Sequence, residues 1–143
     1  MFWPTRTAAG EWLRRLQGQR SGPKNGVILG SLRRLDLADC VLDGLDLYAT
    51  DLSASVMPRH VRGAWLELAN LAGVDLSGRT LSGANLSGTN LSGANLSGAD
   101  LSGANLTNAN LRHAMLADVS LENAVLTNAQ FDRGEPKKSA RRV

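Results

Sequence analysis

A leucine at every fifth position dominates the second half of the chain. The series runs without a gap to a final Phe, and its members are Leu71, Leu76, Leu81, Leu86, Leu91, Leu96, Leu101, Leu106, Leu111, Leu116, Leu121, Leu126 and Phe131. Two residues before each member there is usually a small residue, most often Ala, and the residue between the two is often Asn or Asp. The other two positions of each repeat are mostly Ser-Gly, Thr-Asn or Glu-Asn. A strict internal repeat of this kind predicts a repeat architecture.

A period of five suits neither an α-helix nor a straight strand. On a helix, at about 100° per residue, each fifth residue lies about 140° round from the last, so the leucines would not share a face. On a straight strand every second Leu would face water, although burying a Leu contributes about 1.5–3 kcal/mol. The chain must therefore bend once per repeat, at the Ser-Gly-like pair, where Gly and Asn tolerate a positive φ. The pattern predicts a solenoid whose coils stack about 4.8 Å apart.

This pattern resembles the A(D/N)LXX repeat of the pentapeptide-repeat family. The resemblance extends over about three quarters of the chain and includes thirteen consecutive matches that end at Phe131. It implies an all-β fold, a right-handed, quadrilateral parallel β-helix (a solenoid) with four repeats per coil and about five coils at this length. It also implies that the Leu or Phe and the residue two before it point inward. Some members of the family mimic DNA and bind DNA gyrase, which confers tolerance to quinolones.

The pattern divides the chain into five segments. Residues 1–26 lack the repeat, and helical spacing of their apolar residues predicts a partly helical N-terminal cap over the first coil. A first, irregular repeat block follows at 27–57, a phase break or loop at 58–65, and a regular block at 66–133. Residues 134–143 are predicted to form a basic, disordered tail.

The formal net charge of +3 conceals a division between the ends and the middle. Residues 1–26 carry five basic residues and one acidic, and residues 134–143 carry four and one. Residues 27–133 carry seven basic residues and eleven acidic. Two interpretations of the basic ends stay open: they keep the rod soluble, or they bind a membrane or nucleic acid.

The acids of the first block fall on outward positions, and they are Asp36, Asp39, Asp43, Asp46 and Asp51. Their spacing distributes them around the coil, which favours a solvated belt over a binding patch. A DNA mimic would need about one negative charge per 1.7 Å of rod. The repeat region falls well short of that density, so gyrase binding is the less favoured interpretation.

The five-residue spacing slips once. Counting on from Met57 leads to Arg62, but the apolar residue comes one position early, at Val61. Pro58 has no N–H to donate to a neighbouring coil. The sequence therefore predicts a bulge or a small protruding loop over about residues 57–63.

The predicted loop gathers the candidate partner-binding residues Arg59, His60, Arg62 and Trp65. Arg and Trp are enriched at binding hot spots, and loops on rigid scaffolds often carry function. The alternative is a packing defect between two repeat blocks, with Trp65 lying over it.

Two further residues and the last coil also stand out from the repeat. Arg79 occupies an inward position, and because a buried unpaired charge is costly, the backbone is expected to bulge and release its guanidinium to solvent. Cys40, the single cysteine, is also inward and is expected to be a buried, inert thiol. The last coil, from Val119 to Phe131, has little chain after it to cover it, which suggests an end-to-end homodimer.

No catalytic, cofactor-binding or metal-binding group is predicted. The two histidines are His60 and His113, and His113 occupies a corner with no carboxylate at catalytic spacing. The glycines follow corner spacing, not GxGxxG or GxxxxGK(S/T). A secretory signal and a stretch of roughly 18 apolar residues are both lacking, so a cytoplasmic location is expected. The sequence predicts a non-enzymatic binding scaffold for an unidentified protein partner, with gyrase binding and surface association through the basic ends as alternatives.

Overall fold

The computed structural model of the chain describes residues 31–132. Within this range the chain forms corners and single-residue parallel bridges, and it contains no helix and no longer strand. The N-terminal cap expected at 1–26 and the tail expected at 134–143 lie outside the described residues and stay predictions. None of the described residues belongs to a helix long and apolar enough to span a bilayer.

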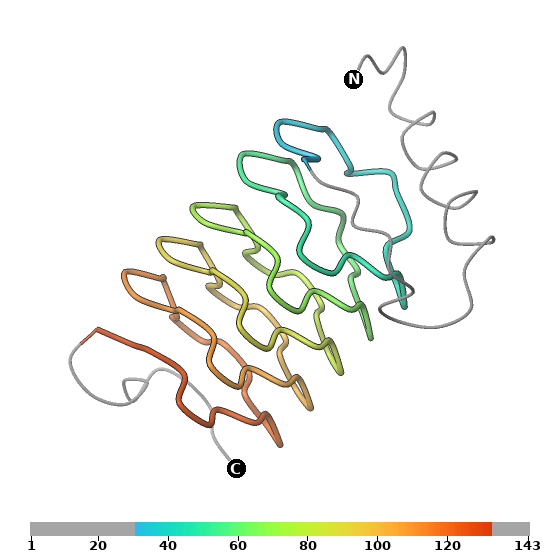
Figure 1. Ribbon diagram of the computed structural model, residues 1–143. Helices are drawn as coiled ribbons and strands as arrows, with labels where there is room; N and C mark the ends of the chain where they lie inside the picture. The colour runs from blue at the N-terminus through green and yellow to red at the C-terminus, as the bar shows by residue number, and fades with distance from the viewer. Residues whose placement is uncertain (1–30, 133–143) are drawn as a thin grey trace.

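Backbone hydrogen bonds join each coil to the next. Most bridges link residues 20 apart, such as Asn85 and Asn105. The N–H of Leu71 donates to the carbonyl of Asn90 at 2.8 Å, and the N–H of Asn90 donates back to the carbonyl of Ala69 at 3.0 Å. Twenty residues are four repeats of five, so each coil has four walls. Figure 1 shows the coils stacked along one axis, from the blue end to the red end.

We name the residue just before each inward Leu the wall position, and the two residues after that Leu the corner. The first wall contains Ser31, Asp51, Asn70, Asn90, Asn110 and Gln130, and these residues begin successive coils. The second contains Asp36, Val56, Asp75, Asn95 and Met115. The third contains Val41, His60, Thr80, Asp100 and Ser120, and the fourth contains Asp46, Trp65, Asn85, Asn105 and Val125.

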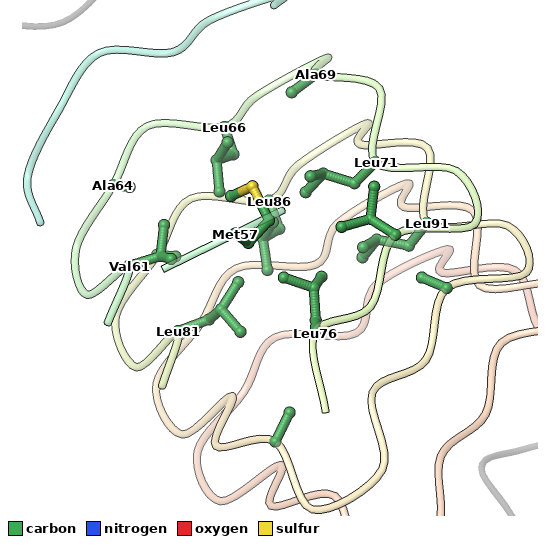
Figure 2. Packing of buried hydrophobic residues seen from close by; sticks show 14 of the residues in the cluster. Met57, Val61, Ala64, Leu66, Ala69, Leu71, Leu76, Leu81, Leu86 and Leu91 are labelled. Atoms are coloured by element: carbon green, nitrogen blue, oxygen red, sulfur yellow. The ribbon is translucent and has the colours of Figure 1, made fainter. Parts of the chain in front are cut away.

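Leucines from all four walls fill the interior. Leu66, Leu71, Leu76 and Leu81 come from four successive repeats and point toward one another (Figure 2). Every member of the series up to Leu111 is at most 2% exposed. Three later members of the series are less well covered. Leu116, Leu126 and Phe131 are half-buried.

Most corners are tight turns closed by one backbone hydrogen bond. At a typical corner the N–H of Ala84 donates to the carbonyl of Leu81 at 3.1 Å, and the second corner residue, Gly83, has φ +66°. A positive φ at this position is typical of a type II turn, which favours Gly or Asn. Residues with a side chain also adopt it, and they are Arg34, Ala49, Ala54, Leu68, Asn108, His113, Asp118, Asn123 and Asn128.

Asp and Asn at the wall positions hold the corner that follows them. The Oδ1 atom of Asn85 accepts the N–H of Ser87 at 3.1 Å and its hydroxyl at 2.7 Å. Asp75 accepts the N–H and the hydroxyl of Ser77 in the same way. This Asx turn explains why Asn or Asp so often precedes the inward Leu.

The same bond gives a structural role to acids that the sequence placed in a solvated belt. Asp36, Asp46 and Asp51 each accept the N–H of the residue two positions later. They lie on the second, fourth and first walls, so they surround the coil as expected.

The phase break removes one residue from the wall. Asp46 bridges Trp65 and Asp51 bridges Asn70, so these two pairs are 19 residues apart where other pairs are 20 apart. The coil that begins at Asp51 is therefore one residue shorter than its neighbours.

The missing residue belongs to the repeat between Val56 and His60, which has four residues. We refer to it as the short repeat. The protruding loop expected over about 57–63 is wrong, because Met57 and Pro58 are buried in the wall. A slip of one residue can arise from an added loop or from a deleted corner residue, and the bridges on both sides identify a deletion.

The backbone does not bulge at Arg79, contrary to the sequence-based expectation. Thr80 keeps its bridges to both His60 and Asp100. The half-buried side chain of Arg79 instead turns back to its own corner, where Nη1 donates to the carbonyl of Ser77 at 3.1 Å. Its Nε atom is buried and has no hydrogen-bond partner within residues 31–132.

Candidate partner-binding surface

The four candidate residues lie on two adjacent walls and the corner between them. Arg59 and His60 are exposed on the third wall, and Arg62 is exposed on the corner that follows. Trp65 is half-buried on the fourth wall, where it bridges Asp46 in the coil before. The fold therefore brings all four to one side of a single coil.

Arg62 is already engaged within the fold. Its Nη2 atom lies 3.2 Å from Oδ2 of Asp43, which is on the same corner one coil earlier. Its backbone N–H donates to Oδ1 of Asp43 at 2.7 Å. Since both side chains are largely exposed, the ion pair contributes at most about 1 kcal/mol. Arg62 ties two coils together and is the least available of the four residues for a partner.

The Asp43–Arg62 contact has a consequence for His60. An Asn or Asp at position 60 would accept the N–H of residue 62, as at regular corners, but here Asp43 accepts it. The side chain at position 60 is therefore not needed to accept the N–H of residue 62, and His60 projects from the third wall.

The side chains of Arg59, His60 and Trp65 make no hydrogen bond or ion pair with any of residues 31–132. Position 59 corresponds to the small inward residue of a regular repeat, but the deleted corner residue leaves Arg59 facing outward. A guanidinium with five donors is thereby exposed without an acceptor.

Two exposed valines extend this surface, and sequence reasoning missed both. Val41 is 54% exposed on the third wall, one coil before His60, and Val56 is 50% exposed on the second wall. The signal that could have found them is the lack of Asn or Asp at a wall position. We refer to Val41, Val56, Arg59, His60 and Trp65 together as the break surface.

The bonding between coils is weaker beside the break surface. Across the part of the chain from 31 to 132, no bridge joins Val56 to Asp75 or Val41 to His60. Both gaps adjoin the short repeat, because its missing residue displaces the backbone from the ladder on either side.

Leu68 adds a strained apolar residue to the same coil. It occupies a second corner position with φ +60°, and it is 52% exposed. A bulky residue in this conformation is an outlier that costs roughly 1–2 kcal/mol. Its side chain lies over Gly88 of the next coil, where an added Cβ would be 2.5 Å from Cδ2 of Leu68.

The break surface combines charged, aromatic and apolar side chains. It offers a guanidinium, an imidazole, an indole and two exposed valines, and no nucleophile with an adjacent base. Among residues 31–132, no three His, Cys, Asp or Glu side chains are placed to hold a metal ion. Cys40, the single cysteine of the chain, is a buried thiol.

Comparison with known proteins identifies the family. The family model for pentapeptide repeats matches residues 69–108 and 104–134. The crystal structure of the pentapeptide repeat protein Rfr23 from the cyanobacterium Cyanothece 51142 is 32% identical, with a TM-score of 0.66. That match covers 89% of this chain and 96% of Rfr23. The chain belongs to the pentapeptide-repeat family, and its fold is the right-handed, four-sided β-helix of that family.

Two further structures are similar at a lower level. A pentapeptide repeat protein from the thylakoid lumen of Arabidopsis thaliana is 29% identical over 76% of this chain and 70% of its own, with a TM-score of 0.45. QnrB1, a plasmid-mediated fluoroquinolone resistance protein, is 18% identical over 72% of this chain and 58% of its own, also with a TM-score of 0.45. No curated protein matches the chain. The family model begins at residue 69, so the break surface lies outside the matched repeats.

Proposed function

We propose that this protein is a non-enzymatic binding scaffold that presents the break surface to another protein. The observation that carries the proposal is a coincidence of features in one place. The short repeat interrupts an otherwise regular wall. There the side chains of Arg59, His60 and Trp65 have no polar partner among residues 31–132, and Val41 and Val56 are exposed. Departures from the rules that stabilise a fold are expected at functional sites.

The rest of the rod supports this assignment by contrast. The walls of the coils after the break are mostly Asn and Asp, whose side chains are used in corner hydrogen bonds. Such walls offer a partner few free groups. The break surface offers both apolar area and unpaired donors on a rigid base, and rigidity lowers the entropy lost on binding.

The test is capture of partner proteins with matched variants. Arg59→Glu with Val56→Ala changes the break surface, and Arg112→Glu with Met115→Ala makes the same kinds of change on the fifth coil. Met115 is 57% exposed, so the control also removes an exposed apolar side chain. We expect partners retained by the wild type and the control to be lost from the break-surface variant. Equal retention by all three proteins would refute the proposal.

The last coil supports a proposal about assembly. Leu116, Leu126 and Phe131 are only half-buried, and Val125 is exposed beside them. End-to-end homodimerisation through residues 119–131 would cover these side chains. Sedimentation at increasing concentration should show a dimer that Phe131→Glu abolishes. A monomer at all concentrations for both proteins would exclude it.

Gyrase binding by DNA mimicry remains the less favoured alternative. Residues 31–132 carry six Arg and eleven acidic residues. Five coils span about 25 Å, over which B-DNA carries about 15 negative charges. A supercoiling assay with excess protein decides the point, because unchanged gyrase activity eliminates this alternative.

Two proposals concern the ends of the chain and rest on sequence alone. We propose that residues 1–26 cap the first coil, and that the basic ends keep the rod soluble. Association of these ends with a membrane or nucleic acid would instead appear as salt-sensitive binding to anionic liposomes or DNA. That binding should disappear when residues 1–20 and 134–143 are removed.

A further inference from the structure

We infer that the break surface binds a short acidic segment of its partner, in which a carboxylate side chain flanks an apolar one. This inference rests on the proposed scaffold function and specifies the chemistry of the partner. The unpaired cation, the apolar side chains around it and the charge of the whole rod support it.

The cation is Arg59. Its guanidinium is exposed and has no acceptor within residues 31–132, whereas the neighbouring Arg62 is held by Asp43 at 3.2 Å. A planar guanidinium matches a carboxylate with two parallel hydrogen bonds, which are stronger than neutral ones. His60, the next residue on the wall, adds a second side chain that can donate. An incoming carboxylate therefore finds donors that no internal acid occupies.

Apolar side chains lie on two sides of this cation. Val41 lies one coil earlier on the third wall, and Val56 precedes Arg59 on the second wall. Trp65 lies on the fourth wall, which faces away from the second. The valines are 54% and 50% exposed, so a partner can bury a substantial part of each. A ligand side chain that is only acidic would leave this area in water, and burying it contributes about 25 cal/mol per Å².

The residues beneath the surface are packed into the interior. Met57 and Val61 are at most 1% exposed, and Figure 2 shows Val61 beside Leu81 and Met57 nearer the centre of the interior. Since packing fixes these residues, the outward side chains start from a preformed backbone. A preformed backbone suits a short segment, which loses its own freedom on binding.

The charge of the rod limits the partner to a segment. Residues 31–132 hold eleven acids against six arginines, so a broadly acidic surface or a nucleic acid would be repelled outside the break surface. A short segment places one or two carboxylates at Arg59 and keeps the remaining contact apolar. The observations thus favour an acidic peptide over a nucleic acid.

The experiment selects ligands from a random-peptide display library on the immobilised full chain. We expect the enriched peptides to share an Asp or Glu beside an aliphatic or aromatic residue. Arg59→Glu should weaken their binding by at least about tenfold, while Arg112→Glu should change it by less than about twofold. Replacing the acid of a selected peptide with Lys should restore binding to the Arg59→Glu protein.

The outcomes separate this inference from the scaffold proposal. Enriched peptides that lack acids, yet bind less to the Val56→Ala variant, would overturn the acidic-segment inference and leave the scaffold proposal standing. Selected peptides whose binding is unaffected by Arg59→Glu and Val56→Ala would overturn both. Thermal unfolding of each variant confirms that a loss of binding is not a loss of fold, and Arg59 is exposed enough for the change to be tolerated.

Discussion

The second corner residue determines how well each repeat closes. Gly83 and Gly88 have nearly the same φ, +66° and +65°, but their surroundings differ. A Cβ at Gly83 would meet nothing within 4 Å, whereas one at Gly88 would meet Cδ2 of Leu68 at 2.5 Å. The positive φ would therefore destabilise an Ala at both sites, but a clash with a neighbouring side chain would arise only at Gly88.

We predict that Gly83→Ala lowers the free energy of unfolding by about 1–2 kcal/mol through its φ alone. Gly88→Ala should lower it further, because Leu68 must move. In a Leu68→Ala background the two glycine variants should become equal. Urea unfolding measures all of these values, and an unchanged difference in that background would refute the contact between Leu68 and Gly88.

Asp75 makes the stability of its corner depend on pH. Hydrogen bonds from the hydroxyl and the backbone N–H of Ser77 hold the pKa of Asp75 below its ordinary value of 3.8, and Arg79 contributes to the lowering. A lowered folded-state pKa means that the stabilisation is fully present above the ordinary value and is lost as the pH falls through the folded pKa.

We predict that Asp75→Asn leaves stability at about pH 7 nearly unchanged and reduces its loss at about pH 3. Asn keeps the Oδ1 acceptor for Ser77, as Asn85 does for Ser87, but it does not titrate. Unfolding curves at both pH values test this. If the two proteins lost equal stability in acid, the carboxylate of Asp75 would have no part in the pH dependence.

Single residues were the hardest features to predict from the sequence. The outward direction of Asn85 follows from its position directly before the inward Leu86. Its hydrogen bond to Ser87, however, depends on the geometry of the corner and not on the five-residue period. Arg79 was expected to distort the backbone. Its side chain is long enough to leave the interior and reach the carbonyl of Ser77, so the backbone ladder survives.

At the scale of one repeat, the short repeat explains why Arg59 is exposed. A regular repeat turns the residue two before the inward Leu into the interior, as it does for Ala84. Adding one residue between Pro58 and Arg59 would restore this geometry. Pro followed by Gly suits the two corner positions of a type II turn, so an inserted Gly is the appropriate probe.

We predict that the Gly insertion alone destabilises the protein by about 1–3 kcal/mol. It moves Arg59 to the inward position, where, as at Arg79, part of the guanidinium group would be buried without a partner. The insertion combined with Arg59→Ala should recover wild-type stability or exceed it. Chemical unfolding of both variants provides the measurement.

The same insertion experiment distinguishes a short repeat that is buried in the wall from a protruding loop. A protruding loop would tolerate one more residue at a cost of a few tenths of a kcal/mol. Insertion without effect, with Arg59 in place, would therefore contradict the account of the short repeat as a buried part of the wall.

At the scale of the whole molecule, the sequence predicted the architecture better than the surface. The uninterrupted series ending at Phe131 requires one bend per repeat and hence a solenoid, whereas four sides and right-handedness came from the family resemblance. The break was visible because Val61 comes one residue early. The exposure of Val41 and Val56 was not, since it depends on which residues neighbouring coils place beside the short repeat.

The regular coils stabilise the whole molecule, and we propose that the interrupted coil serves binding. The regular coils pair their backbone groups, bury their leucines and use their Asn and Asp side chains in corners. The coil that begins at Asp51 instead combines the short repeat with the strained corner at Leu68. Stability and binding should therefore respond in opposite ways to changes on this coil.

The most direct test is a variant that makes this region regular, with Val41→Asn, His60→Asn and Leu68→Gly. Its free energy of unfolding and its binding to the peptides selected on the wild-type chain are measured together. We predict stability equal to the wild type or higher by about 1 kcal/mol, because Gly relieves the φ strain, with binding reduced at least about tenfold. A clear loss of stability, or full retention of binding, would contradict the claim that this surface is specialised for a partner.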